Sequence, residues 1–192
     1  MVRMTWRWLC LEIRVIKWYY WLMALTLFCF VYRLSRKKAS NKDALIRGAL
    51  ATYILLIIIS TILNRGISLE TYNLVPFWTI RALLSSGRKD VISQAFLNIL
   101  LFLPFGFLNA IVIQSFYKNK TILFRCALTI LPGIILSIAI ETVQFITHRG
   151  LCETDDVIHN TLGTLIGYSC WLLIVKARGN IMKTRNKIRR SE

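Results

Sequence analysis

The residues best suited to chemistry lie in one stretch, residues 137–167, where ionisable side chains interrupt long apolar runs. Glu141 lies near the end of the first run and Asp156 lies just before the second, with a short polar turn between them. Ionisable groups inside a membrane are energetically costly and usually mark a ligand site, an ion path or a proton path. A buried carboxylate can also act as a general base, so Glu141 and Asp156 are the candidate catalytic residues.

Neighbouring side chains indicate what such a site would hold. The Arg149 guanidinium suits a phosphate or a carboxylate, because its fork of donors matches two oxygen atoms. The carboxylates suit amines or sugar hydroxyl groups. His148, Glu153 and the two aspartates at residues 155–156 have no familiar metal-ligand spacing, and the five cysteines include no CxxC pair. We therefore expect no metal and no other cofactor.

Each polar residue also has a purely structural explanation. Asn98, Gln144 and Asn160 are side chains of the kind that join membrane helices through hydrogen bonds. An aspartate at residues 155–156 is well placed to cap the helix that follows the turn. Glu141 is the hardest to explain in this way, because an intramembrane carboxylate needs a partner, a proton or a cavity.

The composition of the whole chain is that of a membrane protein. Its 192 residues are 56% hydrophobic with a mean hydropathy of +0.55, far more apolar than a soluble domain of this size requires. The formal charge of +16 would suggest nucleic acid in a soluble protein. Here the basic residues lie between and after the apolar runs, where they set orientation and contact anionic lipid. We expect an all-α, polytopic integral membrane helical bundle that does not bind nucleic acid.

Five apolar runs must position the polar stretch: residues 18–32, 49–63, 91–113, 121–147 and 157–175. The first run covers only about 22 Å at the helical rise, short of the roughly 30 Å hydrocarbon core. The chain therefore has four to five transmembrane helices. We expect three parts: an N-terminal basic and aromatic segment (1–48) with one membrane helix, a membrane domain (49–176) and a basic cytoplasmic tail (177–192).

The distribution of positive charge predicts the orientation. Most of the 25 Lys and Arg residues lie in the loop at residues 33–47, in the short loop near residue 120 and in the tail. These segments fall on one side of the predicted bundle, and basic loops remain cytoplasmic. We therefore expect a multi-pass protein of the plasma membrane whose C-terminus is cytoplasmic. The hairpin at residues 148–156 is then extracytoplasmic, whether or not residues 18–32 cross.

Helical spacing predicts that the polar residues meet at one depth in the outer half of the bilayer. Glu141, Gln144 and His148 share one helix face, because they are three and seven positions apart. Residue Asn98 lies about 10 Å along its own helix from the same side. The predicted ligand-binding residues are Asn73, Asn98, Glu141, Gln144, Arg149, Asp155, Asp156 and Asn160.

The last apolar helix has a face of small and polar residues. Asp156, Asn160, Gly163 and Gly167 follow one another at spacings of four, three and four. Small residues let a neighbouring helix approach closely. We expect this glycine face to pack against the Glu141 face of the preceding helix.

Three blocks of sequence resemble the VanZ-like family of small bacterial membrane proteins. The blocks are NLVPF at residues 73–77, NILLFLPFG at residues 98–106, and ETVQ at residues 141–144 with Arg149 and DDVIHNTLG at residues 155–163. Residues 1–48 and the tail carry none of these blocks, so the first apolar segment looks like an addition to the family's pattern. The resemblance implies a role in the cell envelope, since the founding member is associated with low-level resistance to the glycopeptide teicoplanin.

Two functions agree with these residues and with the resemblance. In the first, an outer polar pocket holds a lipid-linked cell-wall precursor or a glycopeptide antibiotic, with membrane lipids as constant partners. In the alternative, the chain is a membrane-embedded enzyme that modifies a lipid-linked or cell-wall component, with Glu141 or Asp156 as acid or base. A purely structural partner of another membrane protein is a third possibility. The sequence leaves the ligand, the reaction and the oligomeric state open.

Overall fold

The computed structural model of the chain describes residues 18–63, 65–67, 72–86 and 90–188. Residues 1–17 of the expected N-terminal segment and residues 189–192 of the expected tail lie outside this part. The long helices are α2 (Trp18–Arg36), α3 (Asn41–Ile58), α5 (Asp90–Phe116), α6 (Ile122–Thr147) and α7 (Thr154–Ile188). The shorter elements are the π-helical turn η1 (Ile59–Leu63), which extends α3, the strands β1 (Tyr72–Asn73) and β2 (Cys152–Glu153), and helix α4 (Trp78–Ser86).

Within the described residues, four helices are long and apolar enough to cross a membrane. They are Asn41–Leu63, Val91–Phe116, Ile122–Thr147 and Thr154–Met182. The prediction of an all-α, polytopic membrane bundle with four to five transmembrane helices is confirmed. Helix α2 is not among the four, and it packs along α3.

Local sequence signals explain where the helices begin and end. Ser40 and Thr121 each accept a hydrogen bond of 3.2 Å from a backbone N–H in the first turn of α3 and α6. These bonds satisfy N–H groups that have no partner within the helix. Helix α6 ends at Thr147 because His148 adopts a left-handed conformation with φ of 52°. His148 therefore leaves the helix face that Glu141 and Gln144 share, and its side chain is exposed.

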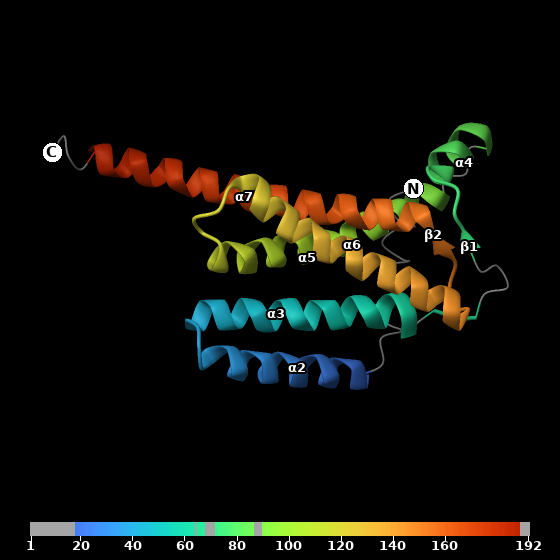
Figure 1. Ribbon diagram of the computed structural model, residues 1–192, viewed down its shortest axis with the longest axis horizontal. Coiled ribbons are helices and arrows are strands. Elements are labelled where there is room, and N and C mark those ends of the chain that lie inside the picture. Colours follow the sequence, from blue (N-terminus) through green and yellow to red (C-terminus); the bar gives the residue numbers. More distant parts are fainter. Residues whose placement is uncertain (1–17, 64, 68–71, 87–89, 189–192) are drawn as a thin grey trace.

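The helices lie side by side, with α2 and α3 antiparallel at one edge of the bundle (Figure 1). Strands β1 and β2 and helix α4 gather at one end, beside the end of α3 and the start of α7. We call this end, formed by residues 65–67, 72–86 and 148–153, the hairpin end. The turns from α2 to α3 and from α5 to α6 lie at the opposite end, and α7 continues beyond them.

The glycine face of α7 packs against α5. A Cβ atom on Gly163 would collide with the backbone carbonyl oxygen of Ile99, and one on Gly167 would collide with that of Leu103. The expectation that this face packs against the Glu141 face of α6 is confirmed for its polar residues, because Asn160 bonds to Ser137 of α6 and Asp156 lies near Glu141. It is wrong for the two glycines, which pack against the backbone of α5 and let the two helix axes come close.

Thr164 places α7 against α6 as well. Its side chain is fully buried, and its hydroxyl donates a hydrogen bond of 3.0 Å to the carbonyl oxygen of Asn160. A Cβ atom on Gly133 of α6 would lie 2.6 Å from the Thr164 Oγ1, and one on Gly106 of α5 would collide with the Thr164 backbone. Helices α5, α6 and α7 are thus locked together at one residue. Next to this contact, the apolar core consists of Ile57, Phe102, Phe105 and Ile140.

The close packing at Gly163 predicts a large effect of a single methyl group. We expect Gly163→Ala to destabilise the protein by about 1–3 kcal/mol, the usual cost of overpacking, because the added Cβ meets backbone that cannot rotate away. Gly179→Ala in the same helix is the matched control, since nothing lies within 4 Å of its Cβ position. Thermal unfolding of both purified variants in detergent checks this. Equal melting temperatures for the two variants would contradict the packing.

Candidate functional site

The hairpin end is closed by backbone pairing between two distant connections. Strands β1 and β2 run parallel, with Tyr72 opposite Cys152 and Asn73 opposite Glu153. Ile67 and Arg149 form a further isolated bridge. These contacts hold the connection between α3 and α4 over the turn between α6 and α7.

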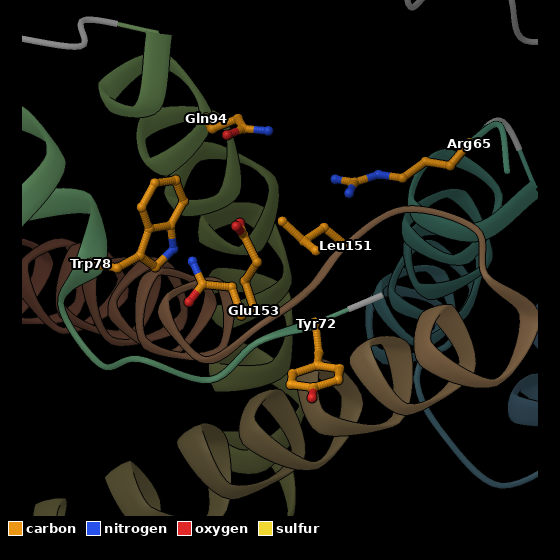
Figure 2. A pocket seen from close by; sticks show the side chains of 7 residues that line it. Arg65, Tyr72, Trp78, Gln94, Leu151 and Glu153 are labelled. Atoms are coloured by element: carbon orange, nitrogen blue, oxygen red, sulfur yellow. The ribbon is translucent and has the colours of Figure 1, made fainter. Parts of the chain in front are cut away.

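Strand alternation sorts the side chains of the two strands onto opposite faces. Asn73 and Glu153 line a cavity of about 450 Å³ at the hairpin end. The Tyr72 ring points away from Glu153 and packs edge-on against Phe145 of α6, with ring centroids 6.0 Å apart (Figure 2).

Glu141 is buried, with 5% of its surface exposed, and it contacts strand β2 beside the cavity. Its Oε2 accepts a hydrogen bond of 2.8 Å from the backbone N–H of Glu153. A carboxylate within a membrane helix thus holds strand β2 in place. The intramembrane charge that the sequence singled out has a backbone partner twelve residues further along the chain.

Asp156 lies beside Glu141 at the start of α7 and is also buried. Its carboxylate is hydrogen-bonded to the Asn98 side chain of α5. Glu141 and Asp156 are close enough to repel each other, and Arg65 is close enough to attract both. Helices α5, α6 and α7 and the segment after η1 therefore contribute to one charged cluster, which we call the Glu141 cluster: Arg65, Asn98, Glu141 and Asp156.

Arg65 is the main residue of this region that the sequence analysis did not single out. It lies two residues after the end of η1, and its side chain extends toward Gln94 and Glu153 (Figure 2). The hairpin leaves room for it at Gly150, where φ is 93° and a Cβ atom would lie 2.9 Å from the Arg65 Cδ. The predicted cation, Arg149, is exposed and does not line the cavity. A lone arginine after an apolar run reads as an orientation signal, so no local pattern distinguished Arg65.

Asp155 has a different role from its neighbour Asp156. Its Oδ1 accepts a hydrogen bond of 2.6 Å from Phe77 N, and its Oδ2 accepts one of 2.9 Å from Thr79 N. These N–H groups lie at the start of α4, so Asp155 caps α4 and not the helix to which it belongs. The contact joins the NLVPF block to the DDVIHN block.

Gln144 and Asn160 join helices through their amide nitrogens. Gln144 Nε2 donates a hydrogen bond of 2.8 Å to the carbonyl oxygen of Thr61, and Asn160 Nδ2 donates one of 2.8 Å to Ser137 Oγ. Both side chains are buried and neither lines the cavity. Their amide oxygens have no hydrogen-bond partner among the described residues.

The cavity is lined by Arg65, Tyr72, Asn73, Trp78, Gln94, Leu151 and Glu153. Of the eight predicted ligand-binding residues, Asn73 is the one in this lining, while Asn98, Glu141 and Asp156 lie in the adjoining Glu141 cluster. Within the described residues, no group of three or more His, Cys, Asp and Glu side chains is arranged to hold a metal ion. The lining offers hydrogen-bond donors and acceptors together with one indole ring.

A family model described as VanZ/LLP1 matches residues 18–175. The chain belongs to the VanZ/LLP1 family. No curated protein and no solved structure matches it. The match and the four apolar helices together identify a multi-pass membrane protein. The match begins at α2, ahead of residue 49, so α2 is part of the family's pattern and not an addition to it.

Cys152 provides a probe of the charges at the hairpin end of this VanZ/LLP1 protein. Burial and the neighbouring carboxylates of Glu141, Asp156 and Glu153 raise the pKa of the Cys152 thiol. Only the thiolate reacts with alkylating agents, and nearby negative charge disfavours it. In a variant that keeps Cys152 as its sole cysteine, we expect alkylation by iodoacetamide at pH 8 to be slower than for a cysteine in a short peptide.

Adding Glu141→Gln removes one negative charge, so we expect the pKa of Cys152 to move back toward its ordinary value and alkylation at pH 8 to speed up. Asp43→Asn is the matched control, because Asp43 lies in the first turn of α3 at the opposite end of the bundle. The rate should be measured from pH 7 to pH 10 for all variants. Identical profiles for Glu141→Gln and Asp43→Asn would contradict the predicted proximity.

Proposed function

We propose that this VanZ/LLP1 protein binds the polar headgroup of a lipid-linked cell-wall precursor, or part of a glycopeptide antibiotic, in the cavity at its hairpin end. The observation that carries the proposal is the Glu141 cluster, in which two buried carboxylates lie within electrostatic reach of Arg65 beside the cavity. Buried charges in a membrane protein are retained mainly where a ligand or an ion uses them. In this proposal the cavity faces the outside of the cell, where wall precursors are exposed.

The lining supports a headgroup that both donates and accepts hydrogen bonds. Arg65 supplies a planar fork of donors, which suits phosphate or carboxylate oxygens. Glu153, Asn73 and Gln94 supply oxygen acceptors for hydroxyl or amino groups. A volume of about 450 Å³ falls within the usual range for small-ligand sites and accommodates a headgroup rather than a whole precursor.

A strain that produces the protein tests the proposal through its susceptibility to teicoplanin. We expect Glu141→Gln, Asp156→Asn and Arg65→Gln each to abolish the effect of the protein on susceptibility. Arg65 is the one of the three that lines the cavity, and for it a lost charged hydrogen bond costs about 1.5–3 kcal/mol, or roughly ten-fold or more in affinity. Glu141→Gln keeps an oxygen that can accept the hydrogen bond from Glu153 N, so the hairpin retains its support.

Thr142→Val is the matched control for these variants. Thr142 is the next residue of α6, it is exposed, and its hydroxyl bonds only to its own helix at Ile138 O. The amount of protein in the membrane should be measured by immunoblot for every strain. Unchanged susceptibility in all three cluster variants at normal protein levels would overturn the proposal.

The alternative function, an enzyme of the envelope, is favoured by one observation. Glu141 and Asp156 are neighbouring carboxylates at the side of a cavity, an arrangement suited to acid and base roles. Mass spectrometry of lipids and wall precursors from the same strains separates the two functions. A covalent change that is lost in Glu141→Gln supports an enzyme, and an unchanged profile with altered susceptibility supports binding alone.

The proposed orientation predicts which residues an impermeant reagent reaches. In a background without the native cysteines, Arg149→Cys at the hairpin end should react with an impermeant maleimide in intact cells. Lys118→Cys, in the exposed turn between α5 and α6, should react only after permeabilisation. The reverse pattern would place the cavity in the cytoplasm and would exclude a role at the outer surface.

A further inference from the structure

The segment from β1 to α4 exposes a row of large apolar side chains. Leu74, Phe77, Ile80 and Leu84 are 61%, 54%, 53% and 81% exposed. Ile80 and Leu84 are four positions apart in α4, so they lie on one side of this helix. Leu74 and Phe77 precede the helix and are exposed next to it in the chain. We call these four residues the apolar ridge.

The ridge faces outward because α4 is held by its other side. Thr79 is buried, Trp78 is half-buried, and α4 packs against α5. The two hydrogen bonds from Phe77 N and Thr79 N to Asp155 fix the start of α4 to the first turn of α7. The exposure of Ile80 and Leu84 is therefore imposed by a rigid attachment to two membrane helices.

The position of the ridge in the chain identifies what covers it. It lies between Leu63, where one membrane span ends, and Val91, where the next begins on the same side of the bundle. The bilayer surface lies at this level. Ile92, Phe96 and Leu100 continue as an exposed apolar stripe along α5, with spacings of four, in the segment that crosses the membrane. The ridge and this stripe on α5 are therefore both exposed apolar surfaces, and the stripe lies in a segment that lipid covers.

The composition of α4 also fits a lipid interface. Arg81 and Ser85 are exposed next to Ile80 and Leu84, so the outer side of α4 combines apolar side chains with polar ones. An interfacial helix places its apolar side chains among the acyl chains while an arginine reaches the headgroups. In water, the same four apolar side chains would remain unburied at considerable cost.

We propose that the apolar ridge docks into the bilayer interface on the cavity side, as a short interfacial helix held in place by Asp155. Trp78 and Asn73 belong to the same segment and line the cavity. The rim of the cavity therefore lies at the level of the lipid headgroups. The docking follows from the exposed ridge and the membrane spans. Only the idea that a ligand enters the cavity from the headgroup level rests on the proposed function.

Spin labels at single introduced cysteines test the docking directly. Labels at Ile80 and Leu84 are compared with a lipid reference at Phe96 and a water reference at Arg149, both of which are exposed. The protein lacks its native cysteines and is placed in nanodiscs of phosphatidylethanolamine and phosphatidylglycerol. Collision with oxygen reports lipid, and collision with a water-soluble nickel chelate reports water.

We expect the labels at Ile80 and Leu84 to collide more with oxygen than with the nickel chelate, as at Phe96 and unlike at Arg149. Nickel collisions as frequent as at Arg149 would overturn the docking, because the ridge would then face water. Exclusion of both reagents would also overturn it, because a second protein surface would then cover the ridge. The result does not depend on teicoplanin susceptibility, so it can fail while the proposed function holds.

Asp155→Ala provides a second measurement in the same samples. It removes both acceptors at the start of α4, so we expect a more mobile spectrum for the label at Leu84. The label at Phe96 on α5 should keep its spectrum, which shows that the bundle remains folded. A Leu84 spectrum that is unchanged by Asp155→Ala would contradict the role of Asp155 in holding the ridge.

Discussion

A carboxylate in an apolar helix must find its partners within the protein, because lipid offers none. Glu141 meets this requirement by accepting a backbone hydrogen bond from Glu153, and the requirement shapes the hairpin end. The bond brings β2 back over α6, β2 then pairs with β1, and β1 carries the connection from α3 to the same place. One buried side chain of α6 thus contacts β2 directly and, through the pairing of β2, is linked to β1, although the three segments are far apart in the sequence.

The two adjacent aspartates at the start of α7 show how neighbouring carboxylates serve different purposes. Asp156 turns toward Asn98 and the Glu141 cluster, and Asp155 turns toward the backbone of Phe77 and Thr79. In a helix, successive side chains point about 100° apart, so two consecutive carboxylates face different neighbours. The pair therefore joins the Glu141 cluster to the start of α4.

The sequence was sufficient to predict the long helices, but not the short elements α4, β1 and β2 or all of the contacts. Hydropathy located the four spans, and the polar residues Asn98, Glu141 and Asp156 were correctly expected to meet, because intramembrane polar side chains have few alternatives. The partner of Gly163 and Gly167 was mistaken, because spacing defines a helix face but not the helix that each part of it meets. Arg65 was overlooked because its significance comes from Gly150, far away in the chain, which leaves space for its side chain.

The hydrogen bonds of Asp155 reach 76 and 78 residues back along the chain to Thr79 and Phe77. Synthesis runs from the N-terminus, so α3, α5 and α6 emerge from the ribosome before this aspartate does. Until then, the backbone N–H groups of Phe77 and Thr79 lack the acceptors that they have in the folded protein. The start of α4 can therefore take up its final position only after the first turn of α7 has been synthesised.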